Sequence, residues 1–178
     1  KFVQRNYLDW INQTTDDIPI MSHDLLRKKV FPHVANNNDR PTVFLLLDNL
    51  RFDQWKTIEP ILSTCFKILE EDSFYSILPT TTQYSRNAIF AGMMPGDIAK
   101  RFPDWWLNDN EKGGKNMYEK ELLTKNVKRS FRQPITFDYV KVTNVDSGKK
   151  LSDTFTNYLH NDLTVIVYNF IDMLSHAR

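Results

Sequence analysis

Four side chains that suit hydrolytic chemistry each follow a segment that reads as a buried strand. They are Asp48 after residues 42–47, Thr82 after residues 74–78, and Asp172 and His176 after residues 163–168. Ligands of open α/β sheets gather beyond the carboxyl ends of the strands. We therefore expect two carboxylates, one imidazole and one hydroxyl to converge at one edge of a sheet.

These residue types favour a metal-assisted attack on a phosphoester. Hard divalent cations prefer carboxylate oxygens, and zinc also accepts imidazole nitrogen. Within a helical turn, Asp172 and His176 would project from one face and could grip one ion. A metal-bound Thr82 hydroxyl loses its proton near neutral pH, and a helix beginning at Thr82 would favour a phosphate. Two metals about 4 Å apart would then stabilise the attacking and the leaving oxygen.

Structural interpretations of the same residues remain open. Asp48 could cap a following helix, and the threonine run 80–82 could form a turn and a helix cap. Asp-x-x-x-His pairs also arise by chance on helices. Arg51 and Arg86 are further candidates, since guanidinium groups hold phosphate by bidentate hydrogen bonds, although arginines after strands commonly form surface ion pairs. We favour the catalytic interpretation because all four residues follow expected strands.

The elements that must position these residues follow from the apolar pattern and the turn residues. Residues 1–35 look helical, with Ser22 as an N-cap, and the polar run 36–41 separates this lead-in from the rest. We therefore predict a helical lead-in or linker over 1–40 and a second unit over 41–178. In that second unit we expect strands at 42–47, 74–78, 135–142 and 163–168, and helices at 53–66, up to Gly92, at 115–129 and from Ser147 to His160.

The alternation of strands and helices predicts an α/β fold with a mainly parallel sheet and flanking helices. The run 42–47 is continuously apolar, which is typical of a strand buried on both faces. Residues 95–118 look irregular and contain Trp105-Trp106. We interpret these tryptophans as a packed lobe, with a substrate platform as the alternative.

Composition narrows the class of protein. The 178 residues are 41% hydrophobic and 13% aromatic, which indicates a globular chain. A net charge of +1 gives no electrostatic reason to expect a nucleic-acid or membrane partner. Cys65 is the one cysteine, so no internal disulfide can form, and this fits a reducing compartment. The longest apolar runs are too short to span a bilayer, so we expect a cytoplasmic location.

Three segments resemble the alkaline phosphatase superfamily, which places an Asp after its first core strand, a Thr or Ser nucleophile at a helix start and a later Asp-x-x-x-His metal pair. Residues 47–51 resemble the first element, and 172–176 the last. The segment from Pro79 to Pro95 resembles the nucleotide pyrophosphatase/phosphodiesterase branch, in which the nucleophile is the third residue after the proline. The resemblance thus selects Thr82.

The sequence is more similar still to the PglZ domain, in particular that of the PorX-type response regulators associated with type IX protein secretion. The segments that carry this resemblance are 48–55, 77–92 and 22–32. It implies the N-terminal half of an alkaline phosphatase-like domain after the helical lead-in. It also implies an attached N-terminal receiver domain, with a homodimer among the expected partners.

The resemblance implies a zinc-dependent phosphodiesterase or phosphatase that acts through a Thr82 phospho-enzyme on nucleotide-type phosphodiesters, cyclic oligonucleotides among them. Asp48 and Thr82 would share one Zn²⁺ and Asp172 and His176 the other. The ligands that complete both sites would lie beyond Arg178, so residues 1–178 alone should be inactive. The alternative is a signalling output module that works by phosphorylation-controlled oligomerisation or partner binding and keeps only a vestigial metal site.

Overall fold

The computed structural model describes residues 1–14, 16–36, 40–107 and 115–176. The chain divides into two compact units. We call residues 30–71 with 131–178 the sheet unit, and residues 1–29 with 72–130 the helical unit. The fold is α/β with a parallel sheet flanked by helices, which confirms the predicted class.

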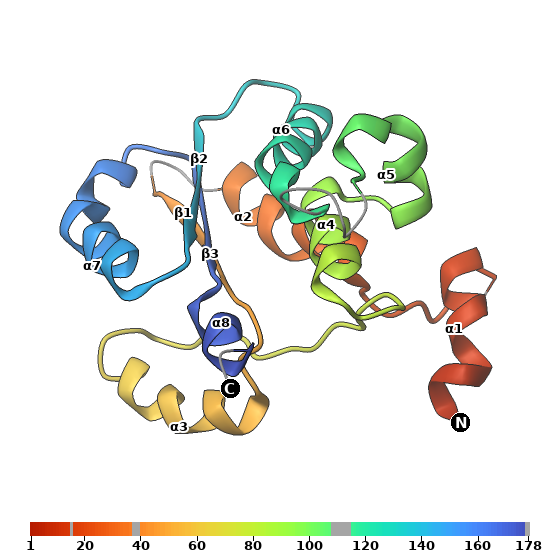
Figure 1. The fold of residues 1–178 in the computed structure, drawn as a ribbon, viewed down its shortest axis with the longest axis horizontal. Coiled ribbons are helices and arrows are strands. Elements are labelled where there is room, and N and C mark those ends of the chain that lie inside the picture. Colours follow the sequence, from red (N-terminus) through yellow and green to blue (C-terminus); the bar gives the residue numbers. More distant parts are fainter. Residues whose placement is uncertain (15, 37–39, 108–114, 177–178) are drawn as a thin grey trace. The chain divides into compact units, whose positions relative to one another are not determined.

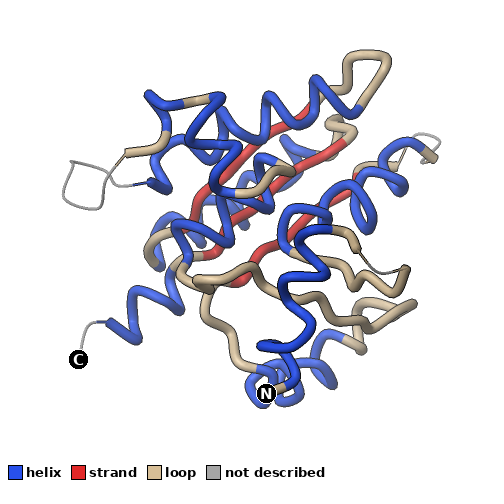
Figure 2. The backbone as a smooth tube through the Cα atoms, turned by 90° about the vertical axis from the view of Figure 1, so that its right-hand side faces the viewer, coloured by secondary structure: helices blue, strands red, loops and turns tan. Residues whose placement is uncertain are grey.

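The sheet unit is built on three parallel strands, shown in red in Figure 2. They are β1 (Thr42–Leu47), β2 (Phe137–Val142) and β3 (Leu163–Tyr168). Their order is β1-β3-β2, and the register aligns the last residues of all three strands, Leu47, Tyr168 and Val142. The three carboxyl ends therefore lie at one edge, which we call the carboxyl edge of the sheet.

The helices of the sheet unit connect and flank these strands (Figure 1). They are α2 (Phe31–Ala35), α3 (Phe52–Leu62), α7 (Val145–Thr154), the 3₁₀ turn η5 (Phe155–Tyr158) and α8 (Phe170–His176). Helix α7 links β2 to β3. Its Gly148 faces the sheet, where a Cβ would lie in ordinary contact distance, 3.4 Å from the Tyr168 hydroxyl.

Two predictions about this unit are wrong. The strand 42–47 is not buried on both faces, since Val43 and Leu45 are 42% and 52% exposed. Successive side chains of a strand point to opposite faces, so Val43 and Leu45 share one face of β1, and an apolar run cannot reveal that this face is exposed. Ser147 is also not the helix cap. Asn144 caps α7 and accepts the Ser147 N–H at 2.8 Å, while the Ser147 hydroxyl accepts the Asn144 N–H at 3.1 Å.

The helical unit packs short helices around α4. Its elements are α1 (Phe2–Asn12), η1 (Ser22–Asp24), the π-helical turn η2 (Leu26–Val30), α4 (Thr82–Ala91), α5 (Pro95–Arg101), η3 (Pro103–Trp105), η4 (Lys115–Tyr118) and α6 (Glu119–Ser130). Residues 86–91 of α4 are buried, and α6 packs against this helix. Gly92 ends α4 in the left-handed conformation at φ 59°, as expected of a helix-terminating glycine.

The predicted strand over 74–78 is absent from the described residues. Tyr75 forms only a single bridge, in which its N–H donates to the Ile20 carbonyl at 2.8 Å and its carbonyl accepts the Ser22 N–H at 3.1 Å. Ile77 is fully buried in a cluster with Trp10 and Met21. The apolar character of this run therefore reflects the packing of Ile77 in that cluster and of Tyr75 on Trp10, not sheet formation.

The segment 95–118 is more regular than predicted, because α5 and η3 lie within it. Trp105 stacks on Phe102 with ring centroids 4.9 Å apart, and Trp106 meets Tyr84 edge-on at 5.6 Å. These contacts confirm the interpretation of the two tryptophans as a packed lobe. Across the described part of the chain, no helix combines the length and the apolar character that a membrane crossing requires.

Candidate functional site

Asp48 and Asn169 lie next to one another at the carboxyl edge of the sheet. The Asp48 N–H donates to the Tyr168 carbonyl at 3.1 Å, and the Asn169 N–H donates to the Val142 carbonyl at 2.8 Å. Each bond extends the strand ladder by one residue beyond the regular strands. The fold thus delivers a half-buried carboxylate and an amide side by side from two adjacent strands.

Asp48 does not cap the helix that follows it. After Asp48 the chain turns through Asn49, which adopts the left-handed conformation at φ 61°, and α3 begins only at Phe52. Arg51 is the N-cap, and its N–H donates to the Gln54 side chain at 3.0 Å. Asp48 therefore lies three residues before the N-cap residue of α3, and its chemical role stays a prediction.

Helix α8 begins two residues after β3 and carries the predicted metal pair. Its first hydrogen bond runs from the Met173 N–H to the Asn169 carbonyl at 3.1 Å. The half-buried Asp172 lies in the first turn, and His176 is the last residue of the helix. Residues four apart share a helix face, so the backbone places Asp172 and His176 on one side of α8. The structure does not describe the side chain of His176.

Thr82 is the first residue of α4, as expected. Thr81 is the N-cap, and its carbonyl accepts the N–H groups of Tyr84 and Ser85 at 2.9 and 3.0 Å. The Thr81 side chain makes no capping hydrogen bond. The first N–H groups of a helix have no acceptor within the helix, so the amide of Thr82 is suited to an external anion.

The four candidate residues fall in different units. Asp48, Asp172 and His176 belong to the sheet unit, where the carboxyl edge brings Asp48 and α8 together, whereas Thr82 belongs to the helical unit. The convergence of Thr82 with the other three residues stays a prediction.

The two candidate arginines have opposite environments. Arg51 is exposed and donates two hydrogen bonds to the Asp53 carboxylate, at 2.9 and 2.7 Å. These bonds hold the pKa of Asp53 at about 2, below its ordinary 3.8. Exposed ion pairs of this kind are weak, so a phosphate could replace the carboxylate on Arg51.

Arg86 is buried one turn after Thr82. Its Nε donates a short hydrogen bond to Glu119, and the two side chains are 4% and 1% exposed. The pair ties α4 to the start of α6. Removing one partner of a buried ion pair costs about 3–5 kcal/mol, so this contact fixes the helix that presents Thr82.

The residues present fit zinc in kind but not in number. Carboxylate, hydroxyl and imidazole groups are suitable ligands, but each predicted shell contains only two of them. Among the residues that the structure describes, no group of three or more His, Cys, Asp or Glu side chains lies close enough to hold an ion. A zinc site takes three or four protein ligands, so both shells would need further residues.

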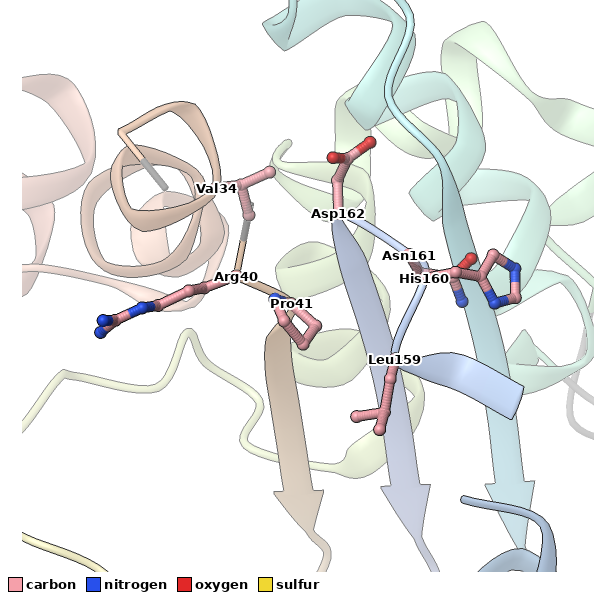
Figure 3. A pocket seen from close by; sticks show the side chains of 7 residues that line it. All are labelled: Val34, Arg40, Pro41, Leu159, His160, Asn161 and Asp162. Carbon is pink, nitrogen blue, oxygen red and sulfur yellow. The ribbon is translucent and has the colours of Figure 1, made fainter. Parts of the chain in front are cut away.

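A pocket of about 280 Å³ lies at the opposite, amino edge of the sheet (Figure 3). Its lining comes from the segments before β1 and β3: Val34, Arg40, Pro41, Leu159, His160, Asn161 and Asp162. Asp162 accepts hydrogen bonds from the backbone and hydroxyl of Thr136, and Asn161 donates to Asp138 at 2.9 Å. Asn161 and Asp162 thus hold the loop before β3 to β2 and to the residue that precedes β2.

Asn169 was not among the predicted site residues. It follows β3 as Asp48 follows β1, and this position relative to the strand end is the signal that could have identified it. The sequence alone did not show which strands are neighbours, so the adjacency of Asp48 and Asn169 emerges only from the fold.

Comparisons with known proteins give one family. A family model described as the BREX system PglZ alkaline phosphatase-like domain matches residues 25–178, which include every candidate residue discussed above. No curated protein matches the sequence.

Proposed function

We propose that this chain, which belongs to the PglZ family of alkaline phosphatase-like domains, contributes one part of a two-metal phosphoester-hydrolysing site. Membership of this family indicates phosphoesterase-type chemistry. The observation that carries the proposal is the carboxyl edge of the sheet, where Asp48 and α8 follow two adjacent parallel strands. Ligand sites of α/β sheets occupy this edge.

The proposed roles follow from the donor types. Asp48 and Thr82 would hold one Zn²⁺, and Asp172 and His176 the other, and further ligands would complete both shells. When bound, the two ions would lower the pKa of the Thr82 hydroxyl and stabilise charge on the phosphoryl oxygens. Thr82 Oγ would bond to phosphorus as the bond to the leaving oxygen breaks, and that oxygen would take a proton from solvent.

Water would then attack the phosphothreonine, release phosphate or a phosphomonoester, and restore the Thr82 hydroxyl. The Thr82 amide at the start of α4 would bind a non-bridging oxygen. We assign a further phosphate contact to Arg51, which is exposed beside the carboxyl edge. We assign Arg86 a positioning role, because its buried guanidinium is bound to Glu119.

The resemblance over residues 48–55 and 77–92 supports a narrower proposal. The whole protein would be a zinc-dependent phosphodiesterase acting on nucleotide-type phosphodiesters in the cytoplasm. It would carry an N-terminal receiver domain, as in the PorX-type response regulators of type IX secretion, and a homodimer would be its regulated form. Residues 1–40 would form the helical lead-in and residues 41–178 the first part of the catalytic domain.

The test compares the intact protein with Thr82→Val and Thr80→Val in hydrolysis of bis(p-nitrophenyl) phosphate. Valine matches threonine in shape and lacks the hydroxyl, and Thr80 is an exposed neighbour in the same run. We expect a loss on the order of a thousandfold for Thr82→Val and an unchanged rate for Thr80→Val. Equal rates for wild type and Thr82→Val would refute the nucleophile.

Zinc analysis of the same preparations separates the two classes of function. The enzyme hypothesis predicts that the intact protein contains zinc and that removal of the zinc by a chelator abolishes hydrolysis. A folded intact protein that binds no metal and hydrolyses no phosphoester would instead support the signalling output module.

A further inference from the structure

A pocket of about 320 Å³ lies beside α1 in the helical unit. It is lined by three aromatic side chains and two carboxylates, those of Phe2, Trp10, Tyr75, Asp9 and Asp17, together with Asn6. None of the residues proposed for phosphoester hydrolysis lines it. The combination of aromatic walls with acidic groups is chemically distinct from the carboxyl edge of the sheet.

The aromatic walls are held in place by the fold. Trp10 is only 7% exposed and packs in the core with Met21 and Ile77. The Tyr75 ring lies 4.7 Å from the Trp10 ring at an interplanar angle of 49°, and the backbone of Tyr75 is fixed by its two hydrogen bonds to residues 20 and 22. The Phe2 ring extends this surface, 5.8 Å from Trp10.

The two carboxylates give the pocket a negative field. Asp9 accepts one hydrogen bond from the Thr14 hydroxyl at 3.2 Å. Within the described ranges, neither Asp9 nor Asp17 has an ion-pair partner within 4.0 Å. Arg5 lies one turn before Asp9 on α1, but it forms no ion pair with Asp9. No lysine, arginine or histidine lines the pocket, so both charges are available to a ligand.

We propose that this pocket binds an organic cation, namely an alkylated ammonium group whose apolar substituents lie on the rings of Trp10 and Tyr75 and whose charge faces Asp9 and Asp17. Aromatic faces carry partial negative charge and attract such cations, most strongly when the cation sheds water easily. Methylated ammonium groups meet both conditions. Their source is either a free small amine or a methylated lysine side chain.

The first test is ligand-observed NMR of the intact protein with choline and its uncharged isostere 3,3-dimethylbutan-1-ol. The two molecules have nearly the same shape, so their difference isolates the charge. We expect saturable choline binding in the millimolar range and at least about fivefold weaker binding of the isostere. Equal binding of both, or no choline binding, would overturn the proposal.

Variants assign the binding to this pocket. Asp9→Asn combined with Asp17→Asn should weaken choline binding about tenfold, and Tyr75→Leu about fivefold. Asp16→Asn is the matched control, because it removes the same charge from an exposed neighbour that does not line the pocket, and it should bind as wild type does. Choline binding that is unchanged in the double variant would refute the assignment.

The source of the cation is resolved by a second ligand, a short peptide containing trimethyllysine. Tighter binding of the peptide than of choline would identify a modified protein segment as the partner, and equal binding would identify a free small amine. A negative result here would not count against the phosphoester site, because the hydrolysis assay of Thr82→Val and the choline titration are independent measurements.

Discussion

Both edges of the sheet carry polar residues, but these residues precede the strands at the amino edge and lead into helices at the carboxyl edge. At the amino edge, Asn161 and Asp162 are engaged with Asp138 and Thr136 and so hold loops to strands. At the carboxyl edge, Asp48 follows β1 three residues before the N-cap residue of α3, and Asp172 lies in the first turn of α8. The pocket at the amino edge is lined by none of the four candidate residues, which teaches that a hollow and the strand ends can point to different parts of one sheet.

The largest expected effect is a loss of activity that occurs for a substitution at the carboxyl edge and not for one at the amino edge. In the intact protein, Asp48→Asn should lower phosphodiester hydrolysis on the order of a thousandfold, because an amide neither neutralises nor binds a divalent cation as a carboxylate does. Steady-state kcat/KM measures this effect. The control is Asn161→Ala at the amino edge, and a comparable loss of activity in the control would break the comparison.

The next effect is on stability and belongs to the amino edge. Asn161 is 5% exposed and donates to Asp138 at 2.9 Å and to the Thr164 hydroxyl at 3.3 Å. Asn161→Ala leaves buried polar groups without this partner, so we expect a loss of about 2 kcal/mol in the free energy of unfolding. Urea denaturation checks this value, and an unchanged stability would show that the amino edge is not structural.

A smaller effect shows that position at the carboxyl edge does not by itself mean function. Asn144 follows β2 at this edge and caps α7 through Ser147. Asn144→Ala should cost about 1 kcal/mol of unfolding free energy and leave kcat/KM unchanged. A selective loss of activity without loss of stability would instead extend the proposed site to β2.

The smallest effect is a titration at the carboxyl edge. The Arg51 hydrogen bonds lower the pKa of Asp53 from 3.8 to about 2. A depressed folded-state pKa contributes stability that is present above pH 3.8 and is lost as the pH falls through 2. Carboxyl NMR should show the pKa of Asp53 returning toward 3.8 in Arg51→Gln, and an unchanged value would mean that the pair does not persist in solution.

The sequence predicted those elements whose signals are local. The strands 42–47 and 163–168 were located because continuous apolar runs end at polar residues, and the end of α4 because Gly92 tolerates a left-handed turn. The failures needed tertiary information. Residues 74–78 are rich in apolar and aromatic residues, as a strand would be, but Ile77 packs in a core cluster with Trp10 of α1. Asn144 and Ser147 both belong to the capping box of α7, and only the geometry shows that Asn144 is the N-cap.

The candidate site divides in the same way. The position of Asp48 after β1 followed from the end of an apolar run, whereas the choice of Thr82 came from the family spacing after Pro79, since no strand precedes it. The burial of Arg86 against Glu119 could not be predicted, because its partner lies 33 residues away in sequence and charged side chains are usually exposed. The adjacency of Asp48 and Asn169 likewise depends on the strand order β1-β3-β2.

The most direct test of the central claim is the metal content of the intact protein. We predict two zinc ions per chain in the wild type, and the loss of about one ion in each of the variants Asp48→Ala and Asp172→Ala, because each carboxylate belongs to a different shell. Inductively coupled plasma mass spectrometry of the folded proteins gives this count. A wild type that hydrolyses phosphodiesters without bound metal, or variants that keep both ions, would contradict the account.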